Sequence, residues 1–281
     1  MKLTPISLVT SIAIASIYVG TNLHAVTATV ATLPSAYLIS LSEDASLTPV
    51  QKNGKWGYIN SATGQMTKFI YDEAGSFYEG LGKVKIGTKY GFVNLAGKQA
   101  IPVKYDEAYY FDNGIAQVKL NEKYGFIDRT GKVVIPIKYD EAETFSSKEQ
   151  KLALVKRQDK YGFIDRTGKE VIPLKFSSAT AFYDQDLTWV SIDNKYGYID
   201  KSGKQAIALQ FDEAQSFFEG TARVKIGEKW GYIDRNGKQF IRPQYEEVED
   251  FKFGLAIVKL NGKSIYIDKN AKVIWNGEGA R

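Results

Sequence analysis

Apolar and polar residues alternate along short stretches of this chain. In Ala116–Leu120, residues 116, 118 and 120 are apolar and residues 117 and 119 are polar, and Arg223–Ile226 alternates in the same way. Successive side chains of a β-strand point to opposite faces, so a period of two predicts half-buried strands. No part of the chain after its N-terminal segment has the apolar stripe of a helix. The pattern therefore predicts an all-β protein.

Turn signals join these stretches into meanders. A short Asn-Glu connection leads from Ala116–Leu120 to Tyr124–Asp128. The chain then turns again at Asp128–Lys132, where Asp can accept from the turn backbone and Gly takes a positive φ. The third strand is Val133–Tyr139, and its Pro136 marks an edge, a bulge or a bend because proline cannot donate to a ladder. We predict a three-stranded meander.

The same meander recurs about seven times. A Lys-aromatic-Gly hexapeptide returns at steps of 34, 34, 37, 35, 34 and 34 residues, with a Tyr or Phe nineteen residues before most of its aromatics and a Phe six residues after that anchor. The hexapeptides begin at Lys55, Lys89, Lys123, Lys160, Lys195, Lys229 and Lys263. A fixed period of about 20–50 residues indicates a repeat architecture. We predict tandem units of about 34 residues, stacked as one curved array. The alternative is a closed seven-bladed β-propeller, which Leu33–Tyr37, in register with the repeat, would complete.

Each hexapeptide carries a glycine in mid-strand, such as Gly125. Glycine weakens a strand, and its usual reason there is the close approach of another backbone or of a ring. We expect a ring from the neighbouring unit, such as the repeated Phe, to cover it. No Gly-x-Gly-x-x-Gly precedes a helix, so the glycines do not indicate phosphate binding.

The first thirty residues have a different composition. Lys2 is the only charge before Glu43, and Ile6–Val19 is apolar. A membrane-spanning helix needs roughly 20 such residues. A charged start, a short apolar core and small residues at the cleavage spacing are typical of a secretory signal peptide. We predict a signal peptide over residues 1–28, cleaved after Ala25 or Ala28, and a single repeat domain over residues 29–281 without a transmembrane span. An uncleaved signal anchor is the alternative.

The residue counts exclude several chemistries. The chain has no Cys and a single His, His24, which lies in the segment predicted to be removed. Zinc sites of the usual type and Ser-His-Asp or Cys-His nucleophiles are therefore out of reach. We expect no catalytic residues, no cofactor and no metal. The 37 Lys and Arg residues are nearly matched by 32 Asp and Glu residues, which indicates a mixed surface and not a nucleic-acid-binding one.

The Lys-Trp-Gly-Tyr-Ile core, the Asp-x-x-Gly-Lys turn and the Ile-Pro-x-x-Tyr-Asp-Glu-Ala segment resemble the bacterial WG (KWG) repeat family. The resemblance covers about Leu33 to Trp275. Only Trp56 and Trp230 keep the Trp, an insertion lies around Ser146–Lys151, and Ser177-Ser178 replace one Asp-Glu pair. The resemblance implies a β-rich, often exported repeat protein with a binding role, and it carries no catalytic residues.

Carboxylates and lysines recur at equivalent places. Pairs such as Asp106-Glu107 and Asp140-Glu141 could be read as glycosidase carboxyls. A catalytic pair should be unique, however, so we interpret them as solvated turns or as partners of the repeated Lys. The lysines that begin the hexapeptides would form a line, the Lys line, that could contact an anionic envelope polymer. The alternative interpretation is a surface whose ion pairs serve only solubility.

One aromatic residue breaks the repeat pattern. Trp189 stands where other units have Lys83, Gln117 or Arg223, on the strand face opposite Val190. Exposed aromatics make efficient contact residues. We therefore predict Trp189 as a ligand-binding residue, unless the insertion of the preceding unit covers it. Three further candidates follow the repeated Phe: Tyr183, Tyr78 and Phe218.

These observations predict an exported, monomeric, non-enzymatic binding module, periplasmic or extracellular. Its partner would be a protein, an envelope glycan or an anionic polymer. The alternatives are a carboxylate-dependent glycan hydrolase and a purely structural spacer.

Overall fold

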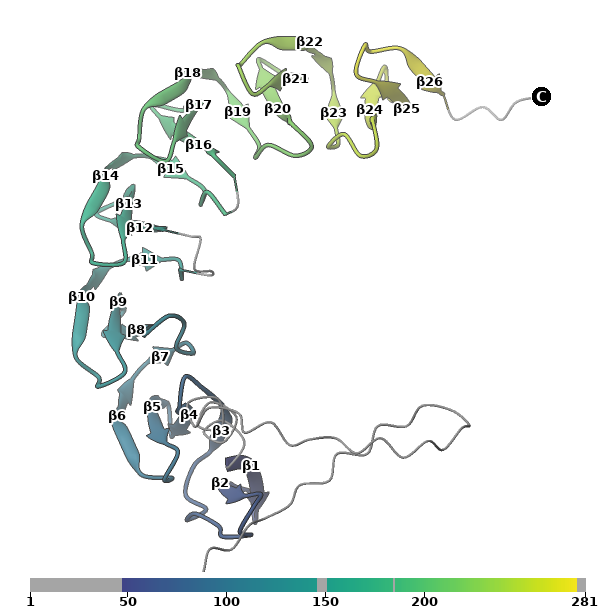
Figure 1. Cartoon of the computed structure of the whole chain (residues 1–281). Coiled ribbons are helices and arrows are strands. Elements are labelled where there is room, and N and C mark those ends of the chain that lie inside the picture. Colours follow the sequence, from purple (N-terminus) through teal and green to yellow (C-terminus); the bar gives the residue numbers. More distant parts are fainter. Residues whose placement is uncertain (1–46, 146–150, 184, 277–281) are drawn as a thin grey trace, which may run out of the picture.

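The structure, a computed structural model, describes residues 47–145, 151–183 and 185–276. Within these ranges the chain forms strands, isolated bridges and turns, and no helix that could cross a membrane. The strands make one two-stranded and six four-stranded antiparallel sheets, arranged in tandem along a curve (Figure 1). The predicted signal peptide, Leu33–Tyr37 and residues 146–150 of the insertion lie outside the described residues.

We number the sheets in chain order. Sheet 1 consists of β1 (Leu47–Lys52) and β2 (Lys55–Asn60). Sheet 2 consists of β3 (Glu73–Tyr78), β4 (Leu81–Ile86), β5 (Lys89–Asn94) and β6 (Gln99–Tyr105). Sheet 3 consists of β7 (Glu107–Ala108), β8 (Ile115–Leu120), β9 (Lys123–Asp128) and β10 (Val133–Tyr139). Sheet 4 consists of β11 (Glu141–Ala142), β12 (Leu152–Arg157), β13 (Lys160–Asp165) and β14 (Glu170–Phe176).

The last three sheets have the same number and order of strands. Sheet 5 consists of β15 (Ser178–Ala179), β16 (Leu187–Ile192), β17 (Lys195–Asp200) and β18 (Gln205–Phe211). Sheet 6 consists of β19 (Glu213–Ala214), β20 (Thr221–Ile226), β21 (Lys229–Asp234) and β22 (Gln239–Tyr245). Sheet 7 consists of β23 (Glu247–Val248), β24 (Leu255–Leu260), β25 (Lys263–Asp268) and β26 (Val273–Trp275).

The six later sheets have four strands where the sequence predicted three. β10 ends at Tyr139, and after Asp140 the chain continues into β11, where Glu141 pairs with Lys156 and Ala142 with Val155. The extra strand needs no turn, because the chain crosses from one sheet to the next in an extended conformation. The Asp-Glu-Ala segment that follows each meander is therefore the first strand of the next sheet.

The last strand of each four-stranded sheet is bulged, and this bulge explains the mid-strand glycines. In β10 the register shifts between Ile135 and Tyr139, around Pro136, as expected for a proline on an edge strand. A Cβ on Gly125 would lie 2.6 Å from the Ile137 Cα and 2.7 Å from the Ile137 nitrogen. The prediction that a neighbouring Phe ring covers this glycine is wrong. The bulged backbone of the same sheet covers it.

The hydrophobic core lies between successive sheets. Phe126, Ile135 and Tyr139 of sheet 3 pack against Phe145 and Val155 of sheet 4. The Phe126 and Phe145 ring centroids are 5.3 Å apart, and equivalent ring pairs join each of the other neighbouring sheets. Each sheet thus buries its faces only with the help of its neighbours, as in other stacked repeats.

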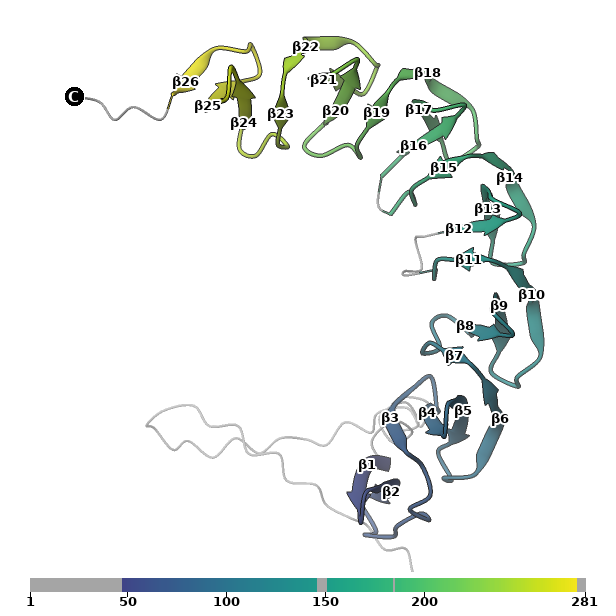
Figure 2. The ribbon, with the colours of Figure 1, turned by 180° about the vertical axis from the view of Figure 1, so that it is seen from behind.

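The described sheets follow an open, C-shaped curve, with sheets 1 and 7 at its two ends (Figures 1 and 2). The last strands, such as β10 and β14, lie along the convex edge. The predicted curved, stacked array is confirmed, and the sheets do not form the closed seven-bladed propeller that was its alternative.

Candidate functional site

The exposed aromatic side chains gather in one kind of connection. In each four-stranded sheet the first strand leads to the second on the concave side of the curve, as the inner connections of sheets 3 to 7 show (Figure 1). Among the described residues, every exposed aromatic except Trp275 lies in or beside such a connection. We call this set the concave aromatic row: Tyr78, Tyr109, Tyr110, Tyr183, Phe218 and Phe253.

Three of the predicted binding residues belong to this row. Tyr78, Tyr183 and Phe218 are 49%, 55% and 44% exposed. Each follows a repeated Phe, and in sheets 5 and 6 that Phe is buried between sheets, so the next side chain turns outward. Tyr183 has a φ of 44° and Phe253 a φ of 52°. Bulky residues rarely adopt this left-handed conformation, and such strain concentrates at functional loops.

Tyr78 and Tyr110 form an exposed aromatic contact between sheets 2 and 3, in addition to the buried ring pair of Phe92 and Phe111. Their ring centroids are 4.4 Å apart, and a Cβ on Gly75 would come within 2.6 Å of the Tyr110 hydroxyl. Lys83 Nζ lies 4.6 Å from the Tyr110 ring centroid and donates to the Ala108 carbonyl at 3.1 Å. Burial lowers the pKa of Lys83. This end of the row therefore combines two rings with a partly desolvated ammonium group.

Glutamates hold neighbouring connections of the row together. The Glu219 carboxylate in sheet 6 accepts from the Phe253 N–H of sheet 7 at 3.2 Å, and Glu79 in sheet 2 accepts from the Gly114 N–H of sheet 3 at 2.9 Å. These bonds cross from one sheet to the next, so they order the loops that display the rings.

Trp189, the fourth predicted residue, lies elsewhere. It is half-buried, packs against the core between sheets 5 and 6, and its ring centroid is 5.5 Å from that of Tyr196. At the same position, Gln117 and Arg223 donate to carbonyls of the next sheet, Ala142 at 2.5 Å and Val248 at 3.1 Å. Alternation correctly separated the Trp189 face from that of Val190, but in a stacked array the outward face meets the next sheet.

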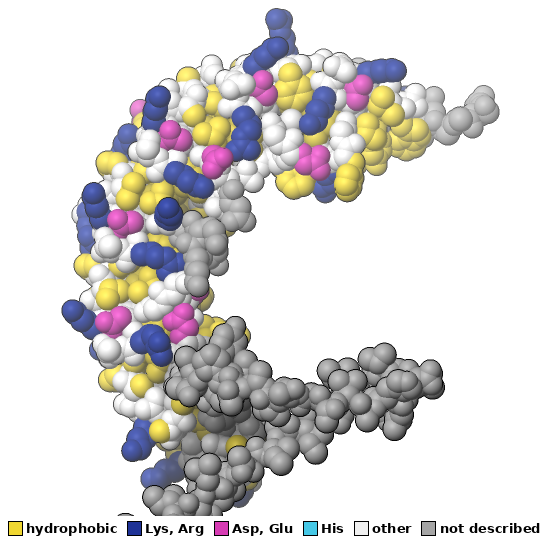
Figure 3. Space-filling model, viewed as in Figure 1, with side chains coloured by type: hydrophobic (Ala, Val, Ile, Leu, Met, Phe, Trp, Pro, Cys, Tyr) yellow, Lys and Arg dark blue, Asp and Glu magenta, His cyan; other side chains and the backbone are white. Residues whose placement is uncertain are grey.

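The repeated carboxylates are held by the repeated lysines. Asp106 accepts from Lys89 Nζ and from the Asn121 N–H, and these hydrogen bonds lower the pKa of the Asp106 carboxyl. Figure 3 shows cationic and acidic side chains recurring beside one another along the array. The arrangement agrees with the interpretation of these acids as partners of the Lys line.

Burial raises the pKa of the Glu143 carboxyl. It lines a cavity of about 250 Å³ with Glu141, Lys156 and Tyr161. Glu141, however, accepts from Lys156 Nζ at 3.0 Å and from the Tyr161 hydroxyl at 3.0 Å. In the part of the chain that the structure describes, no cluster of acidic residues or His could hold a metal ion.

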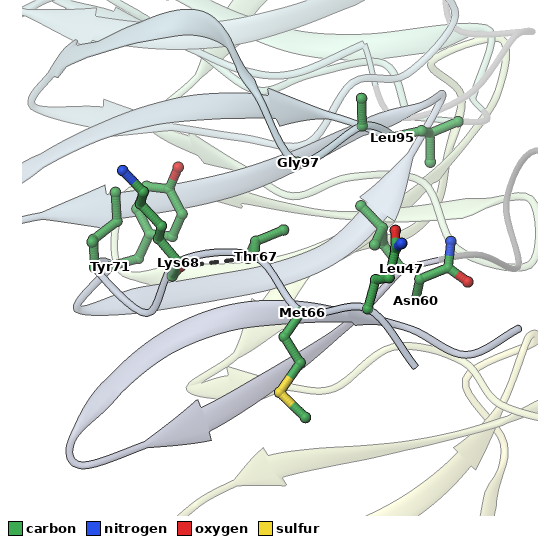
Figure 4. Close-up of a pocket in the computed structure, with 11 residues that line it drawn as sticks. Leu47, Asn60, Met66, Thr67, Lys68, Tyr71, Leu95 and Gly97 are labelled. Atoms are coloured by element: carbon green, nitrogen blue, oxygen red, sulfur yellow. Dashed lines mark hydrogen bonds between the residues drawn. The ribbon is translucent and has the colours of Figure 1, made fainter. Parts of the chain in front are cut away.

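A cavity of about 600 Å³ lies between sheets 1 and 2 (Figure 4). Here the third strand of sheet 1 is reduced to two isolated bridges, Trp56 to Tyr71 and Ile59 to Met66. Thr67 takes the place that Ile101 has in sheet 2, and its Oγ1 accepts from the Tyr58 N–H at 2.8 Å. The lining mixes polar and apolar groups and offers no carboxyl pair.

Fold and site thus define an all-β tandem repeat protein whose exposed rings gather on its concave side. The model of the WG containing repeat matches residues 56–90, 90–124, 124–161, 161–196, 196–230 and 230–263. The chain therefore belongs to the WG repeat family.

Comparison with solved structures finds distant similarities. A eukaryotic initiation factor is 11% identical, with a TM-score of 0.44, over 82% of this chain and 73% of its own. Hsv2p of Kluyveromyces lactis is 10% identical, with a TM-score of 0.37, over 81% and 88%. Apo AztD of Citrobacter koseri is 11% identical, with a TM-score of 0.36, over 82% and 84%. No curated protein matches the chain. Similarity this low adds nothing to the family assignment.

Proposed function

We propose that this protein is an exported, non-enzymatic binding module of the cell envelope or the extracellular space, and that it grips a protein or a glycan with the concave aromatic row. The observation that carries the proposal is the position of the exposed rings: they recur in equivalent connections of different sheets. Rings in such positions can stack on sugars or anchor a protein partner. Export rests on the signal-peptide pattern of residues 1–28.

The state of the carboxylates favours binding over glycan hydrolysis. A glycosidase needs one carboxyl that donates a proton and a second that acts as base or nucleophile across the same bond. The aspartates of the repeat accept hydrogen bonds from lysines, which lower their pKa and keep them ionised. Glu143, with its raised pKa, stands beside Glu141, which is already engaged by Lys156 and Tyr161.

The test compares two double variants of the mature chain on an envelope-glycan array and in a pull-down from envelope proteins. Tyr183→Ser with Phe218→Ser removes two rings of the row. Val133→Ser with Val171→Ser removes exposed apolar groups from β10 and β14 on the convex edge. We expect the first variant to lose roughly tenfold or more in affinity for the captured ligand, as for interface anchors, and the second to bind like wild type.

Equal binding by wild type and both variants contradicts a role for the row. Turnover of a glycan, abolished by Glu143→Gln or by Glu141→Gln, overturns the non-enzymatic function in favour of a hydrolase.

A further inference from the structure

Most junctions between sheets hold one carboxylate in the same way. Asp106 lies in the link between sheets 2 and 3, where one oxygen accepts from Lys89 Nζ of the preceding sheet and the other from the Asn121 N–H in the β8–β9 turn. At the equivalent junctions the acids are Asp72, Asp140, Asp212 and Glu246, and their backbone donors lie 2.7–3.0 Å away at Gly87, Gln158, Gly227 and Gly262. The array therefore displays five copies of a carboxylate bound between an ammonium group and a turn N–H.

The junction between sheets 4 and 5 has both donors and no acid. Ser177 stands in the place of the aspartate, between Lys160 of β13 and the β16–β17 turn, which begins at Asp193. The backbone frame is unchanged, since the Ser177 N–H donates to the Ser191 carbonyl at 2.8 Å, as that of Asp106 does to Lys119 at 2.9 Å. Within the described ranges no carboxylate forms an ion pair with Lys160, and no acceptor reaches the Asp193 N–H.

The neighbouring charges are missing from the same sheet. In sheets 3 and 6 the next pair along is Glu107 with Lys119 and Glu213 with Lys225. In sheet 5 the matching residues are Ser178 and Ser191, which are paired in register. β15 therefore has no glutamate that could pair with Lys160 in place of the missing aspartate. Asp193 has an acidic side chain of its own, in the turn that supplies the N–H.

We propose that the Lys160 ammonium group and the Asp193 N–H form a binding site for a carboxylate supplied by a ligand. One oxygen would accept from Lys160 Nζ and the other from the Asp193 N–H, as the oxygens of Asp106 do with their own donors two junctions away. Hydrogen bonds to an ionised group are the strong ones, and two donors on two oxygens orient the group. The ligand class is a carboxylate, from an acidic peptide side chain or from an acidic sugar. The site is separate from the concave aromatic row and does not depend on it.

Amide chemical shifts of the ¹⁵N-labelled mature chain test the site, with sodium acetate as the probe and sodium chloride at equal ionic strength as the reference. We expect acetate to shift the Asp193 amide saturably. Ser177→Asp places an internal carboxylate in the site and should abolish the shift, and this variant should fold because other junctions carry an aspartate there. Lys160→Met should weaken the response severalfold. Lys123→Met, whose ammonium group serves the Asp140 junction, should leave it unchanged.

An Asp193 amide that responds to acetate no more than to chloride overturns the site, and so does an undiminished acetate shift in Ser177→Asp. A glutamate-rich peptide and an oligouronate, each added to the acetate-bound protein, separate the two sources. Competition by either supports the site and identifies its carboxylate source, and failure of both to compete overturns the proposal.

Discussion

At the scale of single residues, one buried position of the repeat is occupied by Tyr in some sheets and by Phe in others, so the effect of its hydroxyl can be compared. The hydroxyls of Tyr105 and Tyr139 are buried and have no hydrogen-bond partner within the described residues. Phe176 and Phe211 fill the same position in later sheets and are equally buried. The position therefore requires a ring and not its hydroxyl.

We expect Tyr139→Phe to leave the free energy of unfolding unchanged or to raise it by up to about 1 kcal/mol, because it removes an unpaired buried polar group. Tyr198→Phe is the matched control, since the Tyr198 hydroxyl donates to the Gln215 carbonyl at 2.7 Å. Its loss should cost about 1 kcal/mol. Urea unfolding measures the free energy of unfolding of both variants. A larger loss of that free energy for Tyr139→Phe than for Tyr198→Phe would show that the Tyr139 hydroxyl is paired.

The aspartates of the sheet junctions predict how stability depends on pH. The pKa values of Asp72, Asp106, Asp140 and Asp212 are lowered, first by hydrogen bonds from lysines and then by backbone N–H groups. A carboxyl with a depressed folded-state pKa contributes stability that is complete above its unfolded pKa of about 3.9 and is lost as the pH falls through the folded pKa. We expect the unfolding midpoint in urea to stay level from about pH 5 upward on this account and to fall below about pH 4.

Asp106→Asn should make that acid decline shallower, because it removes one of the contributing carboxyls. An unchanged slope in Asp106→Asn refutes the linkage.

At the scale of elements, Trp189 shows how a strand face acquires its function from its neighbour. Its indole packs against the core between sheets 5 and 6, where other sheets place a hydrogen bond to a carbonyl. We expect Trp189→Ala to lower the free energy of unfolding by about 1–3 kcal/mol, less than the 3–5 kcal/mol of a fully buried ring because Trp189 is half-buried.

Tyr183→Ala is the control for this loss, because the Tyr183 ring is 55% exposed and its removal should change stability by about 0.5 kcal/mol or less. Thermal and urea unfolding of the two variants provide the measurement. Equal stability of Trp189→Ala and wild type would return Trp189 to the list of ligand contacts.

At the scale of the whole molecule, the open curve predicts an extended particle. A compact chain of about 255 residues would have a radius of gyration of roughly 18 Å. We expect small-angle X-ray scattering of the chain from residue 29 onward to give a clearly larger value, because the sheets extend along a curve and contact only their neighbours. A radius near 18 Å would indicate that the array closes in solution.

Much of this architecture could be read from the chain, because it depends on local interactions. Alternation identified strands such as Ile115–Leu120, and the Asp-x-x-Gly turn placed the hairpin at Asp128–Lys132, where Gly131 has a φ of 84°. The family followed from the repeated motif. Tyr78, Tyr183 and Phe218 were found as aromatics beside the Phe anchor, whereas Tyr109, Tyr110 and Phe253 carried no such signal, since they do not directly follow it.

The sequence by itself determined the unit of the fold: its period, its meander and its turns, since each depends on residues only a few positions apart. Only the tertiary structure decided what covers each surface. In that structure Asp140–Ala142 links two sheets and adds a strand to the second of them. The bulged backbone at Ile137 covers Gly125, and the Trp189 face packs toward sheet 6. The physical reason is that the crossing of one sheet onto the next depends on the packing of both faces together. The same crossing, repeated along the chain, opens the curve and collects the exposed rings on its concave side.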